Sequence, residues 1–217
     1  MFIVATLAPL LSFPFTGFIT ETDYLGNISA HETAILVGAT LEFIMCIAIA
    51  GIAIWIYPIL RRFNPGAALG YVGLRLFEGV MLMVAIIPML ALLGLGQEFI
   101  AAGSPDFSHF QTSGALLLGM RDWAGHGLAT LAFCLGALVF YFLLYRSRLV
   151  PRWLSGWGFI GALLSLISAL YAIFTQSLGF SSVNVLDAPL GINEMVLAVW
   201  LIAKGFDKSA IESLAAR

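Results

Sequence analysis

The stretch "MRDWAGHGLATLAFCLGALVFYFLLYR", Met120–Arg146, decides the fold class. Its last twenty residues are predominantly apolar, and a helix of about 20 such residues is long enough to cross a bilayer. The seven residues before them, "MRDWAGH", place Arg121, Asp122 and His126 at the mouth of the apolar run. Charge is costly in such a place, so the sequence first raises the question of what these groups do there.

The composition of the whole chain is that of a membrane protein. Of its 217 residues, 61% are hydrophobic and 10% are charged, whereas a soluble domain carries about 25% charged residues. The mean hydropathy is +1.00. The length fits a single domain, residues 1–217. The formal net charge of −2 lacks the basic footprint of nucleic-acid-binding proteins, so no nucleic-acid partner is expected.

We predict an all-α integral membrane bundle of six transmembrane helices. Every backbone polar group in lipid must be satisfied within its own segment, and nothing in the sequence alternates as the strands of a membrane barrel would. The first apolar run has no basic stretch before it, which favours a retained span over a signal peptide. The spans are expected at about 2–19, 33–60, 69–95, 121–145, 154–177 and 187–205.

A further short helix is expected between the third and fourth spans. The stretch "FSHFQTSGALLLG", residues 107–119, is polar at one end and too short to cross the membrane. We therefore expect it to lie at the outer membrane interface, with Ser104 and Pro105 opening it.

The basic residues predict how the bundle is oriented. The loops "TETDYLGNISAHET" and "GQEFIAAGSPDFSHF" hold no Lys or Arg, whereas eight of the ten basic residues belong to the opposite side. By the positive-inside rule, both termini are cytoplasmic. The eight residues are Arg61, Arg62, Arg146, Arg148, Arg152, Lys204, Lys208 and Arg217. The other two, Arg75 and Arg121, lie in or beside spans.

Several ionisable residues fall inside the predicted spans, where such residues are candidates for function by default. Arg75 and Glu78 share one face of the third span, and Asp122 and His126 share one face of the fourth. Counting about 1.5 Å per residue places the charges of four spans in a band from mid-depth outward, which predicts a polar pocket that opens away from the cytoplasm. The expected ligand-binding residues are Glu42, Arg75, Glu78, Asp122, His126, Asn193 and Glu194.

Each of these groups also has a purely structural interpretation. Arg75 and Glu78 can form a helix-packing ion pair, Asp122 can fix the ring of His126, and Arg121 can reach the outer headgroups. No metal site is expected, because the sequence has no Glu-x-x-His pair and only His126 lies near the band. Hydrolase and nucleotide-binding motifs are absent as well, and no cofactor is expected.

Four blocks of the sequence resemble a known family. They are "LRRFNPGAALGYVGLRLFEGV", "GALLLGMRDWAGH", "YFLLYRSRLVPRWLSGWGFIGA" and "NEMVLAVWLIAKGF", and the resemblance runs from about Leu25 to Phe206. The chain resembles the bacterial multi-span family catalogued as domain of unknown function 4386 (DUF4386). The resemblance implies a six- or seven-helix bacterial membrane protein, and it implies no activity. We expect the protein in the bacterial cytoplasmic (inner) membrane. The matching motif positions are Arg61, Arg75, Glu78, Pro151, Arg152, Glu194 and Trp200.

Three functions are compatible with these observations. The leading hypothesis is a non-enzymatic membrane protein, surrounded by membrane lipids, whose polar pocket binds or passes a small ligand, a proton or cation, or a lipid headgroup. The second is an accessory or assembly subunit of a larger membrane complex, in which the charges serve helix packing alone. The third is an intramembrane enzyme, with His126 as general base, Asp122 as its orienting group and Arg75 binding an anionic substrate.

Overall fold

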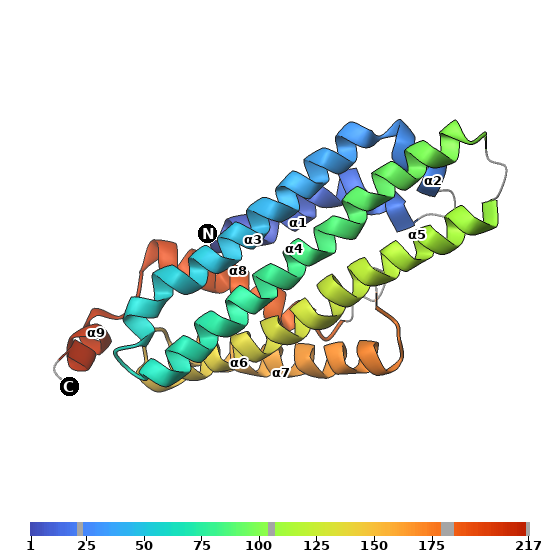
Figure 1. Ribbon diagram of the computed structural model, residues 1–217. Helices are drawn as coiled ribbons and strands as arrows, with labels where there is room; N and C mark the ends of the chain where they lie inside the picture. The colour runs from blue at the N-terminus through green and yellow to red at the C-terminus, as the bar shows by residue number, and fades with distance from the viewer. Residues whose placement is uncertain (21–23, 104–106, 179–184, 216–217) are drawn as a thin grey trace.

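A computed structural model describes residues 1–20, 24–103, 107–178 and 185–215 of the chain. Within these ranges the protein is built from helices, as predicted (Figure 1). In chain order the elements are α1 (Phe2–Thr16), the 3₁₀ helix η1 (Gly17–Thr20), α2 (Tyr24–Ala30), α3 (Glu32–Leu60), α4 (Pro65–Ala101), α5 (Phe107–Asp122), the π-helical segment η2 (Trp123–Ala129), α6 (Thr130–Ser147), α7 (Arg152–Phe174), α8 (Ala188–Ala203) and α9 (Lys208–Ala215).

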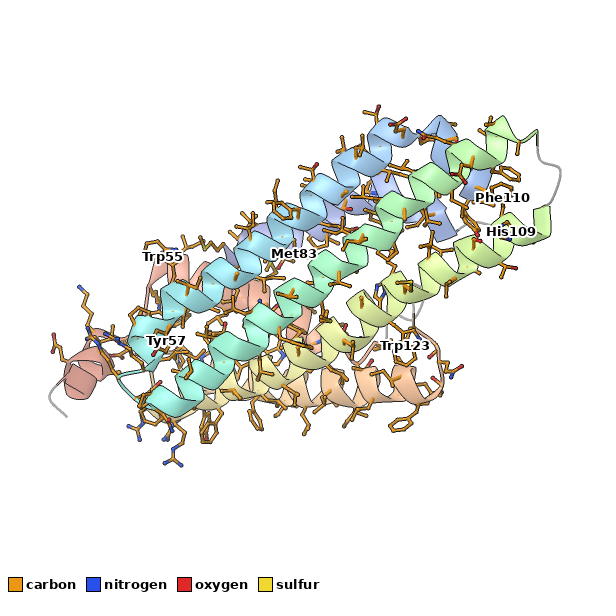
Figure 2. All side chains as sticks on the ribbon, viewed as in Figure 1. Trp55, Tyr57, Met83, His109, Phe110 and Trp123 are labelled. Atoms are coloured by element: carbon orange, nitrogen blue, oxygen red, sulfur yellow. The ribbon has the colours of Figure 1, made fainter. Side chains whose placement is uncertain are left out.

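In the described part of the chain, five helical segments are long and apolar enough to cross a membrane. They are Phe2–Ile19, Glu32–Leu60, Pro65–Ala101, His109–Ser147 and Arg152–Phe174. Large apolar side chains cover their outer surfaces, among them Trp55 of α3, which is 73% exposed (Figure 2). An apolar surface of this extent needs lipid around it rather than water. The chain is therefore a multi-pass membrane protein.

The predicted sixth span corresponds to α8, which is shorter than expected. This apolar helix has 16 residues, and at about 1.5 Å per residue it measures roughly 24 Å, less than the roughly 30 Å of a hydrocarbon core. The count of six spans therefore stays a prediction. In the bundle, α8 packs along α7 and also contacts α1.

The segment before the fourth span differs from the prediction of a separate interfacial helix. Here α5 continues through η2 into α6, and His109–Ser147 forms a single rod of 39 residues. Packing explains the continuity: the ring of Phe110 (labelled in Figure 2) meets that of Phe99 in α4 edge to face at 5.5 Å. The hydroxyl of Tyr24 lies against Gly114. Ser104 and Pro105, which were expected to open this helix, lie outside the described residues.

The long helices are arranged as a ring. Contacts join α1 to α3, α3 to α4, α4 to α6, α6 to α7 and α7 to α8, and α8 returns to α1. Figure 1 shows α3, α4 and the α5–α6 rod as antiparallel neighbours, with α7 along α6. A ring encloses space that a simple pair of helices cannot, so polar side chains can face its interior away from lipid.

Two apolar clusters fill the ends of the ring. One gathers side chains such as Phe140, Leu144 and Leu154, with the ring of Tyr71 stacked on Phe140 at 5.0 Å. The other lies toward α2 and includes Met89. Along α4, Arg75 and Glu78 lie between the two clusters, whereas Glu42 of α3 lies within the range of the second cluster.

One end of the bundle carries the basic residues, and we call it the basic end. The α3–α4 turn, the α6–α7 turn and the end of α8 all lie there (Figure 1). These segments carry Arg61, Arg62, Arg148, Arg152 and Lys204. The basic residues that the sequence assigned to one side of the membrane thus lie together at one end of the bundle. That this end faces the cytoplasm stays a prediction.

The tight contact between α7 and α8 gives a first testable prediction. A Cβ on Gly161 would lie 3.0 Å from the backbone N and Cα of Leu190. We predict that Gly161→Ala lowers the unfolding temperature in lipid nanodiscs, because backbone cannot move aside and overpacking costs about 1–3 kcal/mol.

Gly73→Ala in α4 is the matched control. Nothing in the described part of the chain lies within 4 Å of a Cβ at Gly73. Its unfolding temperature should stay unchanged or rise, since alanine is favoured over glycine in a helix by about 1 kcal/mol. Equal unfolding temperatures for the two variants would contradict the close α7–α8 contact.

Candidate functional site

A cavity of about 200 Å³ lies inside the helix ring. Its walls come from α1, α3, α4, η2, α6 and α8, and its polar lining consists of Thr6, Arg75, Glu78, Thr130 and Glu194. The volume is below the roughly 300–1,000 Å³ of pockets for drug-sized ligands. It corresponds to about seven water molecules at roughly 30 Å³ each. The cavity therefore suits ions, waters or a small organic group. We call it the central cavity.

Arg75 and Glu78 form an ion pair in the wall of the central cavity. They lie one turn apart on α4, with Nη1 of Arg75 at 3.0 Å from Oε2 of Glu78, and each side chain is only 7% exposed. The guanidinium also lies over the ring of Phe133, with Cζ at 5.4 Å from the ring centroid. Nε of Arg75 has no hydrogen-bond partner among the described residues. The pair thus keeps hydrogen-bonding capacity that water or a ligand could use.

Glu194 reaches the same cavity from α8. Its carboxylate makes no ion pair or hydrogen bond with the residues that the structure describes, and Arg75 is the opposite charge that acts on it. The phenols of Tyr71 and Tyr141 lie within electrostatic reach of Glu194. With every group ionised, the central cavity holds two carboxylates and one guanidinium, so its formal charge is −1.

Asn193, which the sequence placed among the ligand-binding residues, has a different position. It is fully buried, and its amide nitrogen donates to the carbonyl of Leu154 in α7 at 3.0 Å. It is not among the residues that line the central cavity. This hydrogen bond links α8 to α7 and thereby helps to position α8, the helix that carries Glu194.

Glu42 and Arg121 form a second polar cluster outside the lining of the central cavity, one helical turn from the lining residues Met45 and Gly125. The two ends of the guanidinium donate to the two carboxylate oxygens at 2.6 and 3.1 Å, and the side chains are 13% and 15% exposed. Arg121 also donates to the carbonyl of Ala85 at 3.1 Å, and Ser12 donates to Glu42 at 3.4 Å. The cluster therefore joins α1, α3, α4 and α5. Arg121 faces inward, so the alternative in which it reaches the outer headgroups is wrong.

Asp122 and His126 form a third pair. Nδ1 of His126 lies 3.3 Å from Oδ1 of Asp122, and the side chains are 39% and 35% exposed. Neither residue lines the central cavity, although Gly125 between them does. In the described ranges, no three His, Cys, Asp or Glu side chains come together as a metal site would require.

The single charged band expected from helix depth is thus divided in space. Arg75, Glu78 and Glu194 share the central cavity, whereas Glu42 pairs with Arg121. The division follows the length of the bundle: Arg121 meets the carbonyl of Ala85, seven residues along α4 from Glu78, so the two groups lie at different depths.

The π-helical segment η2 is a feature that the sequence analysis missed. Its wider turn places Gly125 and Ala129 in the wall of the central cavity, and the hydroxyl of Thr130 donates to the carbonyl of Gly125 at 3.3 Å. Single π turns inside α-helices are frequent at functional sites. The two glycines of "AGHG", on either side of His126, were the signal that could have indicated an irregular turn. Thr130, in an apolar run, gave none.

Comparison with known proteins connects this geometry to a family. The sequence pattern of the domain of unknown function DUF4386 matches residues 1–205. The chain belongs to the DUF4386 family. The resemblance seen in four sequence blocks is therefore confirmed, and the DUF4386 match covers every residue of the central cavity. The comparisons with curated proteins and with solved structures found no match.

The Glu42–Arg121 pair gives the second prediction. We expect Glu42→Gln to lower the free energy of unfolding by about 2–4 kcal/mol, because it leaves a largely buried guanidinium without its counter-charge. A double-mutant cycle with Arg121→Gln, measured by reversible unfolding in mixed micelles, should give a strong coupling energy between the two positions.

The Asp122–His126 pair in the same part of the rod is the control. It is half-buried and lies within one helical stretch, so its cycle, with Asp122→Asn and His126→Gln, should give about 0.5 kcal/mol or less. Comparable coupling in the two cycles would contradict a special role for the Glu42–Arg121 pair in joining the helices.

Proposed function

We propose that this DUF4386 protein is a non-enzymatic membrane protein whose central cavity binds a small cation, or the positively charged group of a small ligand, at Glu194. The observation that carries the proposal is the carboxylate of Glu194. It faces a cavity in which the one guanidinium, that of Arg75, is already paired with Glu78. An isolated carboxylate is costly in an apolar interior, so this position favours a cation or a proton that neutralises it.

The sign of the charge in the central cavity distinguishes between the ligands that the sequence left open, which were a small ligand, a proton or cation, and a lipid headgroup. With both carboxylates ionised, the formal charge of −1 repels an anionic headgroup and attracts a cation. The size of the cavity, about 200 Å³, favours an inorganic cation with some of its water, or an ammonium group of a few atoms. Membrane ionisable residues of this type commonly mark ion or proton paths. We therefore favour a small cation over a lipid headgroup.

The enzyme hypothesis receives less support from the geometry. A general base must lie within hydrogen-bond reach of its substrate, and His126 and Asp122 line no part of the central cavity. An assembly subunit remains the main competitor, because Glu42 and Arg121 already show charges used for packing. We also propose that the basic end faces the cytoplasm, in accord with the positive-inside rule.

The third prediction tests Glu194 directly. Purified protein in nanodiscs is heated in chloride salts of sodium, potassium, rubidium and methylammonium at equal ionic strength. At least one cation should raise the unfolding temperature of the wild type through preferential binding to the folded state. Glu194→Gln should require at least a tenfold higher concentration of that cation for the same rise in unfolding temperature, as expected if a contact worth about 1.4 kcal/mol or more is lost.

Glu98→Gln is the matched control, because Glu98 is an exposed carboxylate of α4 outside the central cavity. It should respond to salts as the wild type does. A wild type that no cation stabilises, or a Glu194→Gln protein that keeps the wild-type response, would refute cation binding at this site. Co-purification with a larger complex in that case would favour the assembly subunit.

A further inference from the structure

A second cavity, of about 570 Å³, lies at the basic end. It is formed by the α6–α7 turn together with the end of α8 and the segment that leads into α9. Its charged lining consists of Arg148, Arg152, Lys204, Lys208 and Asp207. The cavity is separate from the central cavity and shares no lining residue with it. We call it the basic cleft.

The basic cleft carries a strong excess of positive charge. Its four cations make no ion pair with the residues that the structure describes. Asp207, its one carboxylate, accepts hydrogen bonds from the hydroxyl of Ser209 at 2.6 Å and from the backbone N–H of Ala210 at 3.1 Å. These bonds lower the pKa of Asp207 and engage it in capping α9. Four cations against one carboxylate leave a formal charge of +3.

A backbone hydrogen bond and apolar packing connect the two walls of the basic cleft. The backbone N–H of Asp207 donates to the carbonyl of Leu149 at 2.9 Å, which joins the α8–α9 segment to the α6–α7 turn. Phe206 and Ile211 pack against the apolar cluster at this end of the ring. On the floor, Nζ of Lys204 lies 4.6 Å from the ring centroid of Trp200. The cleft is therefore a formed site.

The backbone of Arg148 provides an independent observation. Arg148 follows the last residue of α6 and adopts the left-handed conformation, with φ 57° and ψ 23°. Glycine is the usual residue at this position after a helix, since a side chain there costs conformational energy. A cationic side chain thus occupies a cleft position where the backbone alone favours glycine.

We propose that the basic cleft binds a phosphate group. Guanidinium groups match phosphate oxygens in geometry and charge, and Lys adds a mobile positive charge. The cleft lies at the ends of the membrane helices α6, α7 and α8, the level at which lipid phosphates are found. Basic pockets between membrane helices bind anionic headgroups in this way. Its volume is within the roughly 300–1,000 Å³ range of small-molecule sites, so the cleft is also large enough for a soluble phosphate compound. Such a compound presents the same phosphate oxygens as a lipid headgroup.

Native mass spectrometry of the whole protein tests the proposal. The protein in detergent is titrated with short-chain phosphatidylglycerol and, separately, with phosphatidylcholine of the same chains. The wild type should retain phosphatidylglycerol several-fold more tightly. Arg148→Gly should weaken that binding about fivefold, because each basic group near a membrane surface contributes about 1 kcal/mol. The same variant relieves the backbone strain at position 148, so its unfolding temperature should equal or exceed that of the wild type.

Arg62→Ala is the matched control, because Arg62 is exposed in the α3–α4 turn at the same end and lies outside the cleft. It should bind as the wild type does. Inorganic pyrophosphate separates the two sources of phosphate. Stabilisation of the wild type by pyrophosphate, lost in Arg148→Gly, would assign the cleft to a soluble phosphate compound, whereas selective retention of phosphatidylglycerol would assign it to a headgroup. Equal retention of both lipids without a response to pyrophosphate, or equal losses in Arg148→Gly and Arg62→Ala, would overturn the proposal.

Discussion

Each ionised side chain inside the bundle needs an opposite charge or a polar cavity, because moving it into hydrocarbon costs several kcal/mol. The chain meets this requirement in three ways. Arg75 and Glu78 pair within one helix, whereas Glu42 and Arg121 pair between helices. Glu194 has neither arrangement and faces the central cavity instead. The ring of helices and its two apolar clusters enclose these charged groups, and α8 brings Glu194 to the central cavity.

The two cavities have opposite charge and lie in different parts of the same bundle. The central cavity carries an excess carboxylate, and the basic cleft carries an excess of cations. Fully buried apolar side chains such as Leu143, Leu144 and Leu154 belong to the cluster at the basic end. This cluster includes Ile52 of the central cavity lining and Leu149 of the basic cleft lining, so an apolar region, which screens charges poorly, extends from one site to the other.

Local patterns in the sequence predicted local structure well. Helical spacing of three or four residues was enough to place Arg75 beside Glu78 and Asp122 beside His126. The apolar runs likewise predicted an all-helical membrane protein. The pairing of Glu42 with Arg121 was not predictable in this way, because it depends on how α3 and α5, which are far apart in the sequence, face one another. The uninterrupted α5–α6 rod was missed for a related reason: packing against α2 and α4 supports a helix that its own sequence leaves ambiguous.

The length of that rod has a mechanical consequence. Its 39 residues extend about 58 Å at 1.5 Å per residue, nearly twice the roughly 30 Å of a hydrocarbon core. Even with a tilt of about 20°, more than a third of the rod lies beyond the hydrocarbon. The rod is therefore longer than a hydrocarbon core requires. The π turns of η2 interrupt its regular α-helical geometry between α5 and α6, at the wall of the central cavity. Sharp changes of helix direction are found mainly at prolines, glycine pairs and π turns. We therefore expect any change in the angle between α5 and α6 to occur at Gly125 and Ala129.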